Sequence, residues 1–120
     1  DEAPHATVVR EMHEETGLTV VNPALRAVIT EVSPSEDYQW MMFVYVAHAF
    51  AGEVGETHEG DLAWIPIADL PDLPTPEADR IFGPLVLADD GHVHELKFSY
   101  DEQIRLTRWE EAGAASKPNG

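Results

Sequence analysis

The chain contains no cysteine, few basic residues and no long uninterrupted apolar run. Without cysteine, its 120 residues cannot form disulfides, thiolate nucleophiles or cysteine-based zinc sites. Only 7 lysines and arginines face 23 acidic residues, and the net charge of -16 should repel DNA and anionic membranes. The longest apolar stretch, residues 40–51, is too short to cross a bilayer. We therefore expect a soluble, cytoplasmic protein that works with histidine and carboxylate chemistry.

The organisation along the chain is typical of one small α/β domain. With 43% hydrophobic residues, the chain is long enough for one core and too short for two. We expect a single domain over residues 1–109 and a disordered tail over 110–120. The patterns predict helices over 3–16 and 76–90 and strands over 25–33, 38–50, 62–66, 92–100 and 103–109. This order predicts a mixed sheet held between helices.

Three glutamates are crowded onto the first predicted helix. Glu11, Glu14 and Glu15 stand at i, i+3 and i+4 and therefore project from one face. Each like-charged pair costs about 0.2–0.5 kcal/mol, which an Arg10–Glu14 pair offsets only once. Such a cluster suits a hard divalent cation, either Mg²⁺ or Mn²⁺. The alternative is a solvated acidic helix face.

Residues 2–18 resemble the sequence box of the Nudix hydrolase family. In that box a glutamate is followed by seven residues and then by Arg-Glu-apolar-x-Glu-Glu-x-Gly-apolar, which Glu2 and residues 10–18 match at every position. The family's box glycine and opening strands would precede residue 1, so we expect the domain to be N-terminally incomplete. The resemblance implies the Nudix α/β/α sandwich, with a mixed sheet between helices.

The resemblance also implies roles for the box residues. Glu11, Glu14 and Glu15 would bind the metal ion, and Glu14 and Arg10 belong to the expected catalytic set. Arg10 would orient the carboxylates. Supporting roles fall to Glu2, which would pair with Arg10, and to Gly17, which would form the turn.

Family members often take one further carboxylate from a loop outside the box. Here Glu59 precedes Trp64 by five positions, as in the subgroup that hydrolyses oxidised purine nucleotides. We expect Glu59 to act as a metal ligand or general base, with Glu56 as the second choice. The alternative is that this loop is only acidic.

The second half of the chain resembles that same subgroup, which includes the MutT-type 8-oxo-dGTP diphosphatases. The matching pieces, in order, are Trp64, Leu70-Pro71, Asp79, Phe82-Gly83-Pro84-Leu85 and Leu96-Lys97-Phe98. Asp79 is the candidate for reading the base, or it is an acid stabilised by the helix dipole. Where the vertebrate-type enzyme has two adjacent aspartates and a tryptophan, this chain has Ala78 beside Asp79 and Pro76.

Aromatic residues and histidines complete the candidates. Trp40 and Tyr45 could stack on a nucleobase, although packing in the core is the simpler interpretation. His92 and His94 share one strand face but have no further ligands that would complete a zinc site. We expect four phenylalanines to lie in the core, namely Phe43, Phe50, Phe82 and Phe98.

These features predict an Mg²⁺-dependent hydrolase that converts nucleoside triphosphates, in particular 8-oxo-dGTP-like nucleotides, to the monophosphate and pyrophosphate. The first alternative is a Nudix pyrophosphatase for ADP-ribose, sugar nucleotides or other nucleoside diphosphate derivatives. The second is a catalytically silent nucleotide-binding module. The expected partner is a small nucleotide, not DNA or a membrane, and homodimer formation is left open.

Overall fold

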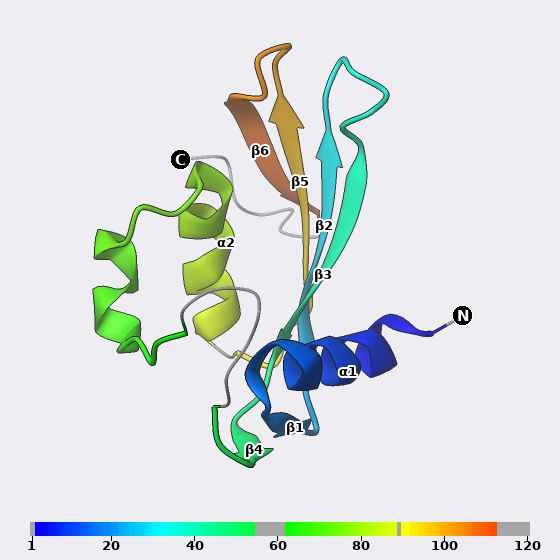
Figure 1. Ribbon diagram of the computed structural model, residues 1–120. Coiled ribbons are helices and arrows are strands. Elements are labelled where there is room, and N and C mark those ends of the chain that lie inside the picture. The colour runs from blue at the N-terminus through cyan, green and yellow to red at the C-terminus, as the bar shows by residue number, and fades with distance from the viewer. Residues whose placement is uncertain (1, 55–61, 89, 113–120) are drawn as a thin grey trace. The chain divides into compact units, whose positions relative to one another are not determined.

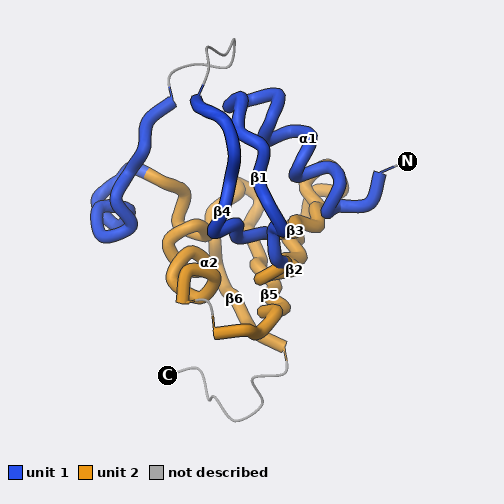
Figure 2. The backbone as a smooth tube through the Cα atoms, turned by 90° about the horizontal axis from the view of Figure 1, so that it is seen from below, with its two compact units in different colours: residues 1–24, 45–74 blue, residues 25–44, 75–120 orange. Residues whose placement is uncertain are grey.

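The computed structural model describes residues 2–54, 62–88 and 90–112. Two compact units divide the chain, the first from residues 1–24 and 45–74 and the second from residues 25–44 and 75–120 (Figure 2). No helix in the described part of the chain is long and apolar enough to cross a membrane.

The first unit contains the helix that carries the glutamate cluster. Helix α1 spans Pro4–Thr16, and Pro4 suits its first turn because the missing N–H would have no partner there. The helix ends at Gly17, whose φ of 82° is left-handed and whose N–H donates to the carbonyl of His13. Strand β1 (Thr19–Val21) follows at once and pairs antiparallel with β4 (Ala49–Ala51) (Figure 1). Both ends of α1 are therefore set by local sequence.

Two strand predictions in this part of the chain are wrong. The run 38–50 divides into β3 (Trp40–Val46) and β4, and residues 62–66 form no strand. Trp64 is 68% exposed, and Pro66 leads into a short 3-10 helix, η1 (Ile67–Asp72). Residues 62–66 have the composition of a strand, but among the described residues no strand pairs with them, and strand formation depends on such a neighbour.

The second unit is built on a four-stranded mixed sheet. Its strand order is β3-β2-β5-β6, where β2 is Ala24–Val32, β5 is His94–Tyr100 and β6 is Leu106–Ala112. Strands β2 and β5 run parallel with Ile29 opposite Leu96, whereas β5 and β6 run antiparallel (Figure 1). The predicted mixed sheet is confirmed. Strand β6 continues to Ala112, three residues beyond the predicted end, and residues 113–120 lie outside the described part.

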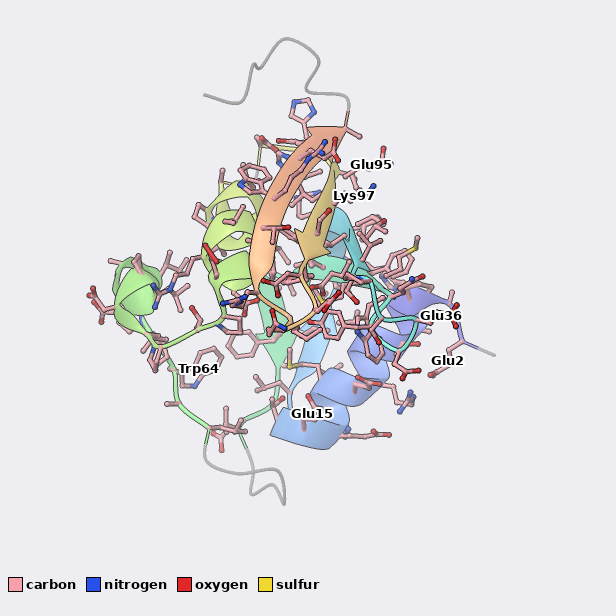
Figure 3. All side chains as sticks on the ribbon, turned by 90° about the horizontal axis from the view of Figure 1, so that it is seen from above. Glu2, Glu15, Glu36, Trp64, Glu95 and Lys97 are labelled. Carbon is pink, nitrogen blue, oxygen red and sulfur yellow. The ribbon has the colours of Figure 1, made fainter. Side chains whose placement is uncertain are left out.

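One face of this sheet packs against helix α2 (Glu77–Leu87). Buried residues alternate along β2 and β5, and Phe98 is the last of them on β5, with its ring centroid 6.5 Å from that of Phe82 on α2. Glu95 and Lys97 point to the opposite face, away from α2 (Figure 3). From His94 to Phe98 the alternation therefore places successive side chains on opposite faces of the sheet.

The predicted phenylalanine core is only partly correct. Phe98 is fully buried and Phe82 partly buried, but Phe43 and Phe50 are 42% and 51% exposed. Phe43 lies on β3, an edge strand, and Phe50 on β4 of the two-stranded sheet. An apolar side chain on such a strand is buried only where another element covers it, which residue type alone does not reveal.

Candidate active site

Helix α1 presents its glutamates to solvent. The side chains of Glu11 and Glu14 are 54% and 58% exposed, and Glu15 is also exposed, near the end of the helix opposite Glu2 (Figure 3). Val8 and Met12 of the same helix line a cavity. The carboxylates of Glu11, Glu14 and Glu15 are therefore accessible from solvent.

Arg10 links two of the box glutamates. Its Nε donates to both carboxylate oxygens of Glu2, at 2.8 and 3.0 Å, and its Nη1 donates to both oxygens of Glu14, at 3.1 Å each. Glu11 lies further away, with its Oε1 3.8 Å from Nη2. The planar guanidinium thus links Glu2, two residues before α1, to Glu14 in the last turn of the helix, and its hydrogen bonds orient the Glu14 carboxylate.

The same contacts keep both Arg10 and Glu2 in their charged forms. The hydrogen bond from Arg10 is the main cause of the lowered pKa of Glu2, and the Glu2 and Glu14 hydrogen bonds raise the pKa of Arg10 above its ordinary value. Both groups are charged at neutral pH. The supporting role expected for Glu2 and the orienting role expected for Arg10 depend on these contacts and stay predictions.

The donor chemistry of α1 suits a hard divalent cation. Carboxylate oxygens are the ligands that Mg²⁺ accepts, and Mg²⁺ is usually bound by one or two carboxylates together with phosphate oxygens and water. Within the described ranges, no group of three or more acidic or histidine side chains is arranged to hold a metal ion. The loop candidates Glu59 and Glu56 lie outside the described residues. The metal-binding role of Glu11, Glu14 and Glu15 therefore stays a prediction.

The candidates for base binding fall in different units. Tyr45 belongs to the first unit, where its ring meets His5 edge-on at 5.9 Å and lines the cavity. Trp40 and Asp79 belong to the second unit, and both are exposed, Asp79 in the first turn of α2.

Two features escaped the sequence analysis. The first is a cavity of about 330 Å³ in the first unit, whose walls include Phe50 and Trp64, stacked with ring centroids 5.3 Å apart. The second is a hydrogen bond from the Tyr100 hydroxyl to Glu31, two residues far apart in the sequence. A signal for Glu31 existed, because it continues the buried alternation of Ala27 and Ile29 along β2.

An α/β fold and an exposed helix, on which Arg10 is hydrogen-bonded to Glu14, define the class of protein. Comparison with known proteins identifies the family. The model of the NUDIX domain matches residues 1–86, so the chain belongs to the Nudix family. It is 33% identical over 109 residues to YvcI of Bacillus subtilis (strain 168), described as an uncharacterised Nudix hydrolase, covering 88% of this chain and 68% of the relative. The crystal structure of a MutT protein from Bacillus halodurans superposes with a TM-score of 0.80 at 29% identity, covering 98% of this chain and 76% of that one.

These matches confirm the resemblance to MutT-type Nudix proteins and the α/β fold class. The protein is a Nudix hydrolase. Nudix hydrolases generally use divalent metal ions and act on small nucleotide substrates.

Proposed function

We propose that the protein is a Mg²⁺-dependent pyrophosphohydrolase of oxidised purine nucleoside triphosphates such as 8-oxo-dGTP. Water adds to a phosphorus of the triphosphate, the bond between the α- and β-phosphates breaks, and the products are the monophosphate, pyrophosphate and a proton. The observation that carries the proposal is the Arg10 bridge, which orients Glu14 on an exposed helix whose other carboxylates remain accessible.

In this proposal each residue of the box has a role. Glu11, Glu14 and Glu15 would hold the cation together with the phosphates, and Arg10 keeps Glu14 in position. The cation supplies neutralisation of phosphate charge and activation of water. Glu59 is the proposed further ligand or general base. The similarity to a MutT protein over 98% of this chain supports the choice of substrate.

The test is a comparison of substrates with and without Mg²⁺. Pyrophosphate release is measured from 8-oxo-dGTP and dGTP, and phosphatase-coupled orthophosphate release from ADP-ribose. We expect 8-oxo-dGTP to be preferred, turnover to require Mg²⁺, and Glu14→Gln to lower kcat/KM about 100-fold or more.

Glu95→Gln is the matched control, because it makes the same change of charge on the exposed side of β5. It should leave kcat/KM unchanged. Preference for ADP-ribose would overturn the substrate proposal but keep the enzyme, and full activity of Glu14→Gln would overturn the assignment of the site.

A further inference from the structure

The hydroxyl of Thr16 bridges the end of α1 and the chain that leaves it. Its Oγ1 donates to the carbonyl of Met12 at 2.6 Å and accepts the N–H of Leu18 at 3.0 Å. A hydroxyl has one proton and two lone pairs, so one side chain serves both partners. Thr16 stands between Glu15 and Gly17, at a position that the Nudix box leaves open, and none of the roles described above uses it.

These two hydrogen bonds act where a helix is weakest. Backbone groups at a helix end lack intrahelical partners, and the last turn frays unless such groups are satisfied. Leu18 is buried, and a buried N–H that loses its acceptor destabilises the fold. The hydroxyl of Thr16 therefore fastens the buried Leu18 to the last turn of α1.

A second contact packs against the same turn. Gly52 follows β4 with a φ of 92°, and a methyl group added to it would come 3.1 Å from the carbonyl oxygen of Gly17. Strand β4 is also paired with β1, with Ala51 opposite Thr19. The turn after α1 is thus closed by a side chain and packed against a neighbouring backbone, and both contacts lie within the first unit.

The turn determines where two of the candidate ligands stand. Glu14 and Glu15 directly precede Thr16 in the last turn of the helix, so fraying there would displace both carboxylates. Arg10 orients the side chain of Glu14, whereas Thr16 fixes the backbone that carries it. A misplacement of about 1 Å can lower the rate of an enzyme about 100-fold.

We propose that Thr16 is a positioning residue of the enzyme, whose hydroxyl keeps the last turn of α1 closed and thereby holds Glu14 and Glu15 in place for hydrolysis. The inference rests on the proposed function in one respect, namely that these two glutamates act in the reaction. It holds for any nucleotide substrate. Thr16 acts through the backbone rather than on the substrate itself.

Thr16→Val and Thr16→Ser test the hydroxyl. Valine keeps the branched shape and loses both hydrogen bonds, whereas serine keeps the hydroxyl. The substrate is whichever of 8-oxo-dGTP, dGTP and ADP-ribose the wild type hydrolyses best. We expect Thr16→Val to lower kcat about 10-fold with KM nearly unchanged, and Thr16→Ser to retain most of the wild-type kcat. Amide hydrogen exchange at Leu18, followed by NMR, should become about 5- to 10-fold faster in Thr16→Val alone.

Thr107→Val is the matched control. Thr107 also donates its hydroxyl to a backbone carbonyl, that of Ser99 at 3.0 Å, but on β6 of the second unit. Its loss should lower the thermal unfolding midpoint about as much as Thr16→Val does, and it should leave kcat unchanged. All activities are measured well below the unfolding temperature.

Gly52→Ala disturbs the same turn without altering Thr16. The added methyl group would press on the Gly17 carbonyl, so this variant should also lower kcat. Gly91→Ala is its control, because Gly91 has a similar φ of 81° and a methyl group there would meet nothing within 4 Å. That variant should keep the wild-type kcat.

The inference is overturned if folded Thr16→Val keeps the wild-type kcat, or if Thr16→Ser or Thr107→Val loses as much activity. If Thr16→Val does not fold, a wild-type kcat in Gly52→Ala overturns it instead. Preference for ADP-ribose would overturn only the substrate proposed above. A wild type that hydrolyses none of the three nucleotides would overturn the proposed function and, with it, the positioning role.

Discussion

At the scale of single residues, Arg10 connects the stability of the box to its chemistry. It is partly exposed, as are Glu2 and Glu14, so these ion pairs add little to the free energy of unfolding. The geometry of these ion pairs matters more than their energy. One guanidinium holds two carboxylates in place, Glu2 through Nε and Glu14 through Nη1. Arg10 is thus expected to affect catalysis far more than folding.

Arg10→Lys tests whether Arg10 affects catalysis more than folding. Lysine keeps the charge but cannot engage Glu2 and Glu14 together through a planar fork, so we expect kcat/KM to fall about 10- to 100-fold. The thermal unfolding midpoint should be nearly unchanged. Arg105→Lys is the control, because Arg105 is also exposed and paired, with Asp101, in the β5–β6 connection. A variant Arg10→Lys with wild-type kcat/KM would contradict the orienting role.

Tyr100 gives a prediction about alkaline pH. Its pKa in the folded state is raised above the unfolded value of about 10, chiefly by burial and then by Glu31. The neutral hydroxyl therefore stabilises the fold fully below pH about 10, and this contribution is lost as the pH rises through the folded-state pKa. Absorbance titration near 295 nm should show a late tyrosine ionisation that Tyr100→Phe removes.

The stability of the same variant provides the second measurement. The difference in the free energy of unfolding between wild type and Tyr100→Phe should be largest at neutral pH and should shrink above pH about 10. A difference that grows with pH, or an ordinary pKa for Tyr100, would show that the hydroxyl is not held by Glu31 as described.

At the scale of secondary-structure elements, the turn after α1 determines where the glutamates stand. Gly17 has a φ of 82°, and β1 begins two residues later. This left-handed turn ends the helix directly after Glu15 and Thr16, so the last ligand candidates lie in its final turn. A change in this turn should therefore affect both the fold and the site.

Gly17→Ala and Gly91→Ala form a matched pair. Gly91 has a φ of 81°, almost that of Gly17, and a methyl group there would meet nothing within 4 Å. Each substitution should lower the free energy of unfolding by about 1–2 kcal/mol, because alanine is strained in this conformation. Only Gly17→Ala should also lower kcat/KM, measured well below the unfolding temperature. Equal activity losses in the two variants would argue against a special role for this turn.

At the scale of the whole molecule, the net charge of -16 opposes the binding of a polyphosphate. Two negatively charged partners repel each other at long range, and dissolved salt screens that repulsion. The screening length falls from about 30 Å at 0.01 M ionic strength to about 8 Å at 0.15 M. Salt should therefore assist this enzyme, unlike one that attracts its substrate with a basic surface.

This effect can be measured directly. With free Mg²⁺ held constant, kcat/KM for the triphosphate should rise several-fold as KCl is increased from about 10 to 150 mM. A neutral solute at equal osmolarity is the control and should have no such effect. A decrease in kcat/KM with salt would indicate that cationic groups, rather than the acidic surface, dominate the approach of the substrate.

The sequence by itself determined the parts that depend on neighbouring residues. The helix predicted over 3–16 differs from α1 by one residue at its start, because Pro4 and Gly17 act locally on the backbone. The family and the fold class were also recognisable, since the box occupies only residues 2–18 and the order of elements follows from local patterns. The Arg10–Glu14 contact was predictable for the same reason, because one helical turn separates the two residues.

Only the tertiary structure decided what depends on partners distant in the chain. In the described part of the chain, residues 62–66 pair with no strand despite their strand composition, and the apolar side chains of Phe43 and Phe50 are 42% and 51% exposed. Glu31 and Tyr100 are 69 residues apart, and their hydrogen bond exists because β2 and β5 run side by side in one sheet. Pairing between strands brings together residues that no local rule relates. For this reason the glutamate helix could be predicted from the sequence, whereas the hydrogen bond from Tyr100 to Glu31 could not.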